Sequence, residues 1–408
     1  MRILYLSPWF PYPLDTGFRI RVYHMLSVLA QQHRVTLLTL DPQGWAPAQI
    51  EPVKPLCEHV EIVEADPFNR PRAQQATRFL SFGPIVAAPF AEMSARVQQL
   101  HRQQPFDVVI ASSVMMAAYT LDLPQVTRIL EEHNSNTRWM YDRYRAQRTA
   151  MQKLRCWASW RKSALYEARL FPHFDLVTMV SEQDAAATRK LLHGKSRVEV
   201  SPNGVDAAHF IPGLAEPQPD TLIFGGALTY EANFEAMHYF LKDVYPLIKQ
   251  QRPDVTLRIT GSTGKAHLSG LALDKSVILT GFVDDVRPVV AGAWVSIAPI
   301  LSGGGTRLKI LESMALGTPV VSTSKGAEGI EVTDGQHLLI ADDAASFARR
   351  VVELLADRAL RERLTHTARH LVVSQYDWTA IAQRFLSWME QVKAQGAKPS
   401  HQKMGIIP

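Results

Sequence analysis

The sequence predicts an α/β protein made of two Rossmann-like halves, in which short apolar strands alternate with helices. First, its 408 residues are too many for one ordinary hydrophobic core, so two domains are expected. Second, hydrophobic residues make up 46% and charged residues 20%, a globular composition. Third, the alternation of strand and helix stops at 203–220, a polar segment rich in proline and glycine, and then restarts.

The first half begins with "RILYLS" (2–7), a short apolar run of β character that ends at a proline. A loop rich in Pro, Asp and Gly follows, then helical spacing over 21–32 and a second strand at 34–40. Strand, helix and strand in this order predict a parallel βαβ unit. Further strands are expected at 60–63, 107–111, 127–130, 175–180 and 196–202.

The second half repeats this alternation. Strands are expected at 221–226, 255–261, 277–282, 295–300 and 319–323. Helices are expected at 233–251, 306–316, 344–355 and 358–374. We therefore expect one domain over 1–202, a second over 203–377, an amphipathic closing helix over 378–395 and a loose tail over 396–408.

Composition narrows the function classes. The two cysteines, Cys57 and Cys156, are far apart, which argues against a disulfide framework or a zinc site. The start of the chain is too quickly interrupted by prolines for a signal peptide, and no apolar run approaches the ~20 residues of a membrane span. We expect a cytoplasmic protein. The net charge of +5 favours anionic partners, but no module that reads nucleic acid is recognisable.

The stretch "ILSGGGTRLKILESMALGTPVVST" (300–323) predicts an anion site. Glycines before a helix N-terminus allow backbone N–H groups to approach phosphate oxygens, and Arg307 and Lys309 add positive charge. Glu312 would repel phosphates, so we expect it to accept hydrogen bonds from hydroxyls such as those of a ribose. Together these groups indicate a nucleotide. The alternative is a glycine-rich turn with two solvated cations and a glutamate that favours the helix dipole.

The order of several motifs resembles the retaining glycosyltransferases of family 4. These motifs are "SEQDAA" (181–186), "PNGVD" (202–206), "TGFVDDVRPVVAGAWVSIAPI" (280–300), "GGGTRLKILESMALGTPVVST" (303–323) and "GAEGI" (326–330). The resemblance implies the GT-B fold, in which two Rossmann-like domains face each other across a cleft and a C-terminal helix crosses back to the N-terminal domain. The subgroup that it most resembles is the sugar transferases of exopolysaccharide gene clusters.

The resemblance implies roles for the glycine-rich stretch. Glu312 matches the second glutamate of the family's E-x7-E motif, which holds the donor ribose. Position 304, where the first glutamate is expected, is Gly304, and the N–H groups of Gly304, Gly305 and Thr306 are expected to replace that side chain. Many members carry an Arg and a Lys after the first strand of the second domain, but "GGALTYEANFEA" (225–236) has no cation. Arg307 and Lys309 are therefore the candidates that bind the diphosphate.

Four more positions match the family less closely. Gly17 follows the first strand, where the family places glycines near the donor phosphates, and Asn233 is expected near the cleft or as a helix cap. His133 matches a histidine that points at the donor sugar; the alternative is a structural histidine at a strand end. Glu328 is expected near the sugar. The polar neighbours that compete with His133 for its role are Glu131, Glu132 and Asn134.

The resemblance implies transfer from a nucleotide-diphosphate sugar with retention, no cofactor and no metal. The acid pairs at 284–285 and 342–343 are predicted turn or capping residues, not a DxD site. The acceptor is expected to be a glycan or lipid-linked. The segment 138–170, with nine Lys or Arg and interleaved aromatics, suits peripheral contact with an anionic membrane, or else forms two solvated helices. A silent nucleotide-sugar-binding subunit, and an epimerase or hydrolase, are the alternative functions.

Overall fold

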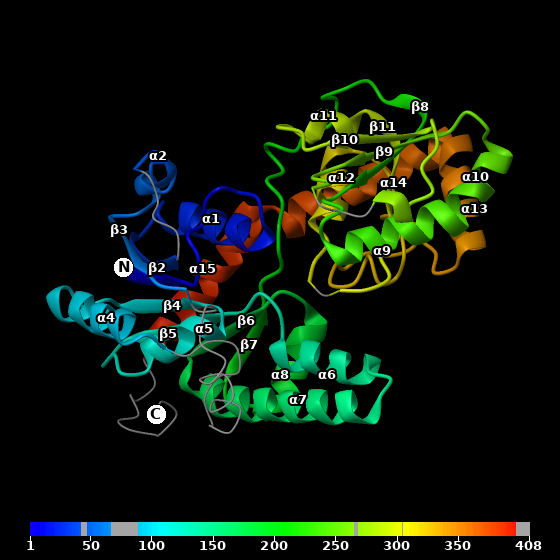
Figure 1. The fold of residues 1–408 in the computed structure, drawn as a ribbon. Coiled ribbons are helices and arrows are strands. Elements are labelled where there is room, and N and C mark those ends of the chain that lie inside the picture. The colour runs from blue at the N-terminus through cyan, green and yellow to red at the C-terminus, as the bar shows by residue number, and fades with distance from the viewer. Residues whose placement is uncertain (42–46, 67–88, 265–267, 304, 397–408) are drawn as a thin grey trace. The chain divides into compact units, whose positions relative to one another are not determined.

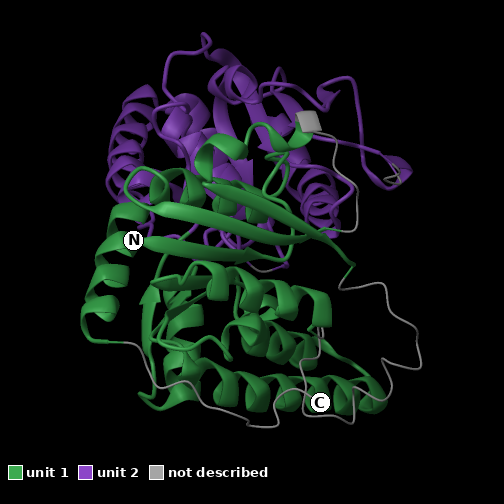
Figure 2. Cartoon of the chain, turned by 90° about the vertical axis from the view of Figure 1, so that its left-hand side faces the viewer, with its two compact units in different colours: residues 1–202, 382–408 green, residues 203–381 purple. Residues whose placement is uncertain are grey.

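The computed structural model describes residues 1–41, 47–66, 89–264, 268–303 and 305–396 (Figure 1). The chain divides into two compact units, which Figure 2 shows in green and purple. Unit 1 is Met1–Pro202 together with Ala382–Pro408, and unit 2 is Asn203–Ile381.

Unit 1 contains a parallel sheet of seven strands in the order β3-β2-β1-β4-β5-β6-β7. The strands are β1 (Arg2–Ser7), β2 (Arg34–Asp41), β3 (His59–Glu64), β4 (Val108–Ser112), β5 (Thr127–Glu131), β6 (Leu176–Met179) and β7 (Arg197–Val200). The α-helices are α1 (Gly17–Leu29), α2 (Pro47–Ile50), α4 (Ala91–Gln103), α5 (Val114–Ala117), α6 (Asn136–Ala146), α7 (Ala150–Leu170) and α8 (Glu182–Leu192). Short 3-10 turns are η1 (Lys54–Leu56), η2 (Ala118–Thr120) and η3 (Phe171–His173).

The central position of strand β1 in the sheet explains why its residues 3–6 are all apolar. Successive side chains of a strand point to opposite faces, and β1 is a central strand with helices on both sides. Ile3 and Tyr5 pack into one core cluster with α1, and Leu4 and Leu6 pack into the other cluster. A strand that is covered on both faces has no place for alternating polar residues.

Unit 2 contains a parallel sheet of six strands in the order β10-β9-β8-β11-β12-β13. The strands are β8 (Gln218–Gly225), β9 (Thr256–Thr260), β10 (Val277–Gly281), β11 (Ala293–Ala298), β12 (Val320–Ser322) and β13 (Leu339–Ile340). The α-helices are α9 (Glu231–Tyr239), α10 (Tyr245–Gln251), α11 (Arg287–Ala291), α12 (Leu308–Leu316), α13 (Ala344–Ala356) and α14 (Arg358–Leu371). Three short turns complete the unit: η4 (Phe240–Val244), η5 (Leu268–Gly270) and η6 (Val372–Tyr376).

Helix α15 (Trp378–Ala394) begins in unit 2 and continues in unit 1. Its residues from Ala382 onward pack into the same cluster as Ile3 and Tyr5, through Phe385 and Met389. At the start of unit 2, the backbone of Gly204 passes so close to α15 that a Cβ would lie 2.6 Å from Ile381 Cδ1. The first residues of unit 2 and the start of α15 are therefore packed together.

The predicted α/β fold class is confirmed, and the differences lie in local geometry. The helix expected over 233–251 is interrupted by a π-helical turn, η4, directly before Pro246 at the start of α10. Proline has no N–H to donate into the preceding turn, which favours such a bulge. The helix expected from 21 begins at Gly17, because the Thr16 hydroxyl accepts from the N–H of Arg19 and caps it. The two-residue strand β13 is too short to be recognised from its sequence.

Candidate functional site

The glycine-rich stretch lies in unit 2, between β11 and α12. Gly303 and Gly305 have φ values of +90° and +80°, a region that side chains with a Cβ rarely adopt. Gly304 lies outside the described residues. Helix α12 begins at Leu308 rather than at 306, with Arg307 in the N-cap position. The loop therefore extends two residues further than the sequence indicated.

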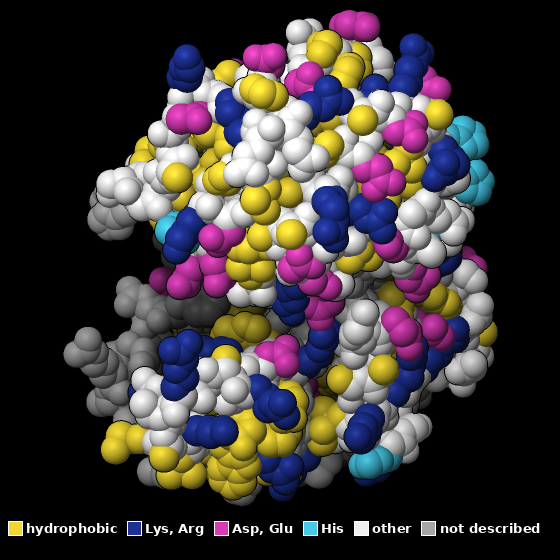
Figure 3. Space-filling model, turned by 90° about the vertical axis from the view of Figure 1, so that its right-hand side faces the viewer, with side chains coloured by type: hydrophobic (Ala, Val, Ile, Leu, Met, Phe, Trp, Pro, Cys, Tyr) yellow, Lys and Arg dark blue, Asp and Glu magenta, His cyan; other side chains and the backbone are white. Residues whose placement is uncertain are grey.

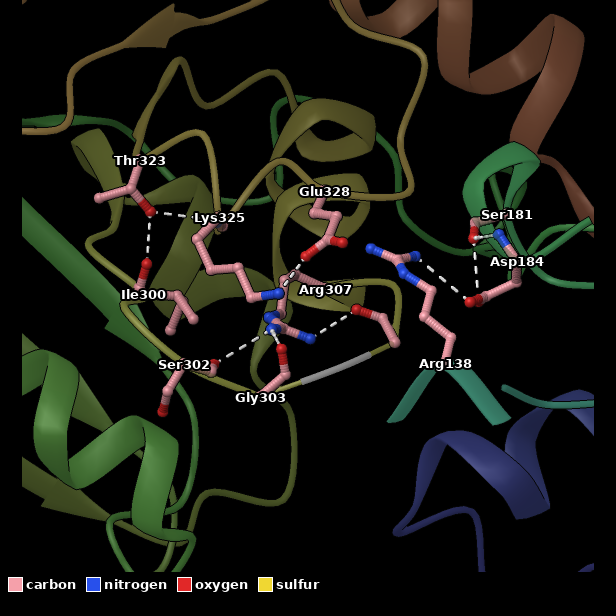
Figure 4. Close-up of polar contacts among 12 residues, drawn as sticks. Arg138, Ser181, Asp184, Ile300, Ser302, Gly303, Arg307, Thr323, Lys325 and Glu328 are labelled. Carbon is pink, nitrogen blue, oxygen red and sulfur yellow. Dashed lines mark hydrogen bonds and ion pairs between the residues drawn. The ribbon is translucent and has the colours of Figure 1, made fainter. Parts of the chain in front are cut away.

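Arg307 is turned back onto this loop (Figure 4). Its guanidinium donates to the carbonyl oxygens of Gly303 at 3.0 Å and of Ser302 at 3.3 Å, and also to Gly305. Burial lowers the pKa of Arg307 from its ordinary value, which does not prevent the side chain from remaining charged. Arg307 thus holds the glycine loop in shape, a role that the sequence analysis did not include.

Lys309 is held by a residue that the sequence places 76 positions away. Its Nζ donates to Asn233 Oδ1 at 2.8 Å and lies 4.0 Å from the centre of the Phe224 ring. The amide nitrogen of Asn233 in turn donates to the carbonyl of Ala227 at 2.9 Å. Asn233 is inside α9 and makes no cap, so the capping alternative is wrong.

Gly226 is the reason that these two side chains fit. Its φ is +151°, and a Cβ at this position would lie 2.7 Å from both Asn233 Nδ2 and Lys309 Nζ. Burial, and secondarily the charge of Arg307, lower the pKa of Lys309 to about 7. Within the described part of the chain, no carboxylate forms an ion pair with Lys309.

Glu312 lies one turn further along α12 and is only partly exposed. Burial raises the pKa of its carboxyl to about 7, although Lys309 opposes this shift. No described residue donates a hydrogen bond to it, and the buried Oγ1 of Thr306 likewise has no partner among described residues. A carboxylate, an amine and a hydroxyl with unused hydrogen-bonding capacity therefore lie on or just before one helix.

Glu328 follows β12 and is ion-paired with Lys325, three residues earlier (Figure 4). Tyr230 and Glu328 both act to raise the pKa of Arg307, against the larger effect of burial. The structure thus groups Asn233, Thr306, Lys309, Glu312, Arg307, Gly305 and Glu328 in unit 2. Sequence reasoning missed Lys325; the spacing of three residues from Glu328 was the available signal.

The remaining two predicted residues, Gly17 and His133, belong to unit 1. Gly17 is the first residue of α1 instead of a loop residue, and the ring of the next residue, Phe18, lies 4.3 Å from the His133 ring. His133 Nε2 is 2.8 Å from Ser112 Oγ at the end of β4. Burial and the positive charge of Arg21 lower the pKa of His133 well below its usual value, so the imidazole is neutral at pH 7.

The acidic neighbours of His133 are buried. Glu131 accepts from Arg21 Nε at 2.8 Å and from the Tyr5 hydroxyl, and Arg21 also donates to the carbonyl of Pro202 at 2.7 Å. Burial, together with the negative charge of Glu167, raises the pKa of Glu132 well above its usual value. Glu131 is therefore a structural residue that links the end of β5 to β1 and α1. Arg21 is not among the predicted site residues, because it lies inside an ordinary helical pattern.

The described ranges contain neither a candidate metal site nor a candidate membrane span. No group of three or more His, Cys, Asp or Glu residues there could hold a metal ion. No helix of these ranges is both long and apolar enough to cross a bilayer. Asp343, in the second acid pair, caps α13 by accepting from the N–H of Ser346, so its predicted capping role is confirmed.

Family models match both units. The model described as "Glycosyltransferase Family 4" matches residues 16–209, in unit 1 and the start of unit 2. The model described as "Glycosyl transferases group 1" matches residues 219–357 in unit 2. The second match includes the glycine loop, Asn233, Lys309 and Glu312.

Two curated relatives illustrate the range of similarity. An uncharacterized 44.6 kDa protein in the cps region of Klebsiella pneumoniae is 20% identical over 92% of this chain and 96% of its own length. A phosphatidyl-myo-inositol mannosyltransferase of Mycobacterium leprae is 33% identical, over 50% of this chain and 56% of its own length.

Solved structures share the fold at low identity. A sucrose-phosphate synthase from Thermosynechococcus elongatus has a TM-score of 0.72 at 18% identity, covering 97% of this chain and all of the other. The Anabaena protein HepE, in complex with UDP, has a TM-score of 0.67 at 16% identity, covering 96% and 100%. The two parallel sheets, one in each unit, thus agree with the GT-B fold class that the sequence indicated. The chain therefore contains a glycosyltransferase family 4 domain, in residues 16–209, and a group 1 glycosyltransferase domain, in residues 219–357.

Proposed function

We propose that the protein is a retaining hexosyltransferase that moves a sugar from a nucleotide-diphosphate sugar to a glycan or lipid-linked acceptor, in exopolysaccharide or cell-surface polysaccharide biosynthesis. The observation that carries this proposal is the arrangement in unit 2. Lys309 and Glu312 lie on α12 behind a glycine loop, and neither makes an ion pair with any described residue. Opposite charges with unused capacity suit a ligand that has both phosphates and hydroxyls.

In the proposed complex, Glu312 accepts hydrogen bonds from the ribose hydroxyls. Lys309 and the N–H groups of Gly305 and Thr306, next to the start of α12, bind the diphosphate, with Gly304 contributing its own N–H group. Helix N-termini bind phosphates because their first N–H groups are unpaired and the dipole is positive there. Arg307 already donates to the loop carbonyls, so it fixes these N–H groups and adds positive potential.

Lys309 would also assist departure of the nucleoside diphosphate. Its pKa of about 7 leaves part of the population neutral without ligand. A phosphate beside Nζ favours the charged form, so donor binding would draw a proton onto the amine. Asn233 already holds Nζ in place before the donor binds. The charged amine would therefore stabilise the leaving group without reorganisation, which lowers the barrier to transfer.

In unit 1, we assign a donor-sugar contact to His133, with Gly17 near the phosphates and Glu328 of unit 2 near the sugar. A neutral imidazole can accept one hydrogen bond and donate another. Glu131 is ill-suited to act as a nucleophile, since it is fully buried and ion-paired with Arg21. This favours the front-face route to retention, in which the leaving phosphate accepts the proton of the acceptor. Since Arg307 and Lys309 supply positive charge, we propose that no metal or other cofactor is needed.

The proposed pathway and location draw on the relatives. One lies in a cps region, and another is named as a phosphatidyl-myo-inositol mannosyltransferase. We accordingly propose a cytoplasmic enzyme that works at the inner face of the cytoplasmic membrane, in peripheral contact through residues 138–170. Gly304, in place of the family's first glutamate, favours a second candidate: a nucleotide-sugar-binding subunit without turnover.

The test is ligand-induced thermal stabilisation by UDP, GDP, ADP and their common sugar conjugates. A nucleotide at ~100 times its Kd should stabilise the wild type by roughly 2.7 kcal/mol. Lys309→Met should abolish the shift, whereas Lys242→Met, an exposed lysine of η4, should retain it. Lys309 is preferred to Arg307 because removing Arg307 would also release the loop.

Two outcomes would count against the proposal. If no nucleotide stabilises the wild type, unit 2 is not a donor site. If nucleotide sugars bind but no sugar is released or transferred with glycan or lipid-linked acceptors, the silent-subunit alternative is correct. An epimerase or hydrolase would consume the donor without any acceptor.

A further inference from the structure

Helices α6 (Asn136–Ala146) and α7 (Ala150–Leu170) form a hairpin in unit 1 whose two arms are joined by aromatic rings. The Trp160 ring lies 4.9 Å from the Tyr141 ring and 6.0 Å from the Tyr144 ring, and it stacks on the latter. These three aromatics are thus used inside the hairpin. Two further aromatic residues of the segment 138–170, Trp139 and Trp157, are exposed, at 43% and 44%.

The outer face of α7 carries a stripe of apolar side chains that no described residue covers. Met151 is 83% exposed, Leu154 65% and Leu165 48%, and Ala158 lies between them. At 100° per residue these four positions fall within an arc of roughly 60°, so they share one face. From Met151 to Leu165 the stripe is roughly 21 Å long. We call these four residues the α7 stripe.

Positive charge borders the α7 stripe. The segment 138–170 contains nine Lys or Arg but only Asp142 and Glu167 as acids, and Glu167 is buried, where it accepts from the Thr137 hydroxyl. Arg155 and Arg161 are exposed on α7, within a turn or two of the apolar residues. In the lower part of Figure 3, at the height of α6 and α7 in Figure 1, Lys and Arg side chains lie among hydrophobic ones.

Most of these cations are not neutralised by a neighbour. Six of the nine form no ion pair with a carboxylate of the described ranges: Arg143, Arg145, Arg148, Lys153, Arg155 and Arg161. Arg143, Lys153 and Arg161 lie instead over aromatic rings, at 4.9–5.8 Å from the ring centres. The surface therefore combines an uncovered apolar stripe with a surplus of positive charge.

We propose that the α7 stripe docks on an anionic lipid surface, with α7 lying flat on the bilayer. The apolar side chains would enter the boundary between headgroups and acyl chains, and the flanking arginines would contact lipid phosphates. A second copy of this chain fits the same face poorly, because two surfaces with a surplus of cations repel each other. A nucleic acid would use the arginines but leave Met151, Leu154 and Leu165 exposed to water.

This proposal deepens the proposed function, since a lipid-linked acceptor would lie at the same surface. Only the biological purpose of lipid binding rests on the proposed function; the binding itself does not. Lipid binding can be measured without donor, acceptor or turnover, so the failure of one proposal is distinguishable from the failure of the other.

The experiment is co-sedimentation of the full chain with vesicles of phosphatidylcholine alone, or of phosphatidylcholine and phosphatidylglycerol in a roughly two-to-one ratio. The wild type should bind the anionic vesicles and should be released by high salt. Met151→Glu/Leu154→Glu should lower the partition coefficient by about tenfold or more, because it places charge where apolar contact is needed. Arg155→Glu/Arg161→Glu should have a similar effect on anionic vesicles.

The controls replace exposed residues of unit 2 instead. Leu273→Glu, in unit 2, removes an exposed apolar side chain, and Arg358→Glu reverses an exposed charge on α14. Both should bind like the wild type. Each stripe variant should keep the melting temperature and the nucleotide-induced shift of the wild type, which shows that it is folded.

Three results would overturn the proposal. The first is a wild type that does not sediment with anionic vesicles, and the second is a stripe variant that sediments as well as the wild type. The third is a dimer, detected by light scattering, that only the stripe variants dissociate. The last result would assign the α7 stripe to a second copy of this chain.

Discussion

The carboxyl ends of the two sheets carry similar residues in opposite states. In unit 1, Glu131 at the end of β5 is fully buried and bonded to Arg21 and Tyr5, so its charge is compensated inside the protein. In unit 2, Lys309 and Glu312 are partly exposed, their pKa values both lie at about 7, and neither is ion-paired with a described residue. The first arrangement stabilises the fold, whereas the second has charge available for a ligand.

The largest effect on stability is expected at the buried ion pair of unit 1. Arg21→Met should destabilise the protein by about 3–5 kcal/mol, because it leaves Glu131 charged, buried and without its partner. Urea denaturation measures this loss. The double variant Arg21→Met/Glu131→Met should recover much of it; if it does not, the pair contributes through something other than compensated charge.

Glu312→Ala should lower activity without lowering stability. Loss of a charge-assisted contact to the donor should reduce kcat/KM by roughly 10–100-fold. The effect of the variant on stability should be the opposite of its effect on activity. The folded-state pKa of Glu312 is raised from 4.5 to about 7, so folding of the wild type becomes less favourable as the pH rises through that window. Above pH 7 the variant should therefore be at least as stable as the wild type. Glu362→Ala, on α14, is the control that should leave activity unchanged.

Gly226→Ala tests whether the position of Lys309 matters as well as its presence. The added Cβ would displace the Asn233 amide or the Lys309 amine, which should weaken nucleotide binding by roughly tenfold, or about 1.4 kcal/mol. Gly213→Ala is the matched control, because it has a φ of +80° but no atom within 4 Å of the new Cβ. Equal losses of nucleotide affinity in both variants would show that backbone strain, not displacement of Lys309, is responsible.

A further effect should appear in the pH dependence of stability. The folded-state pKa of Lys309 is lowered from 10.5 to about 7, so the folded state binds fewer protons than the unfolded state between these values. The cost of burying the charge is thus fully present below pH 7 and disappears as the pH rises toward 10.5. Lys309→Met should be stabilised relative to the wild type at pH 6 and progressively less at pH 9. A difference that is independent of pH would mean that the amine is charged throughout.

Most of the fold could be predicted because strand and helix signals are local. Each strand of the two sheets except β13 overlaps a predicted strand, since most of these parallel strands have buried, apolar centres. The errors occur where local geometry depends on one atom: the missing N–H of Pro246 and the hydroxyl of Thr16. The site was predicted less completely. "GGGTRLK" indicated a loop, two cations and a helix, but not that Arg307 bonds the loop itself.

By itself, the sequence determined the fold class, the order of the elements and the residues that can carry charge next to the glycine loop. These follow from hydrophobic period, turn composition and motif spacing, which are properties of neighbouring residues. Only the tertiary structure decided which charges are compensated. Arg21 meets Glu131 across 110 positions, and Asn233 meets Lys309 across 76. Burial and pairing between distant residues set the pKa of a group and its remaining hydrogen-bonding capacity, and no local pattern records either.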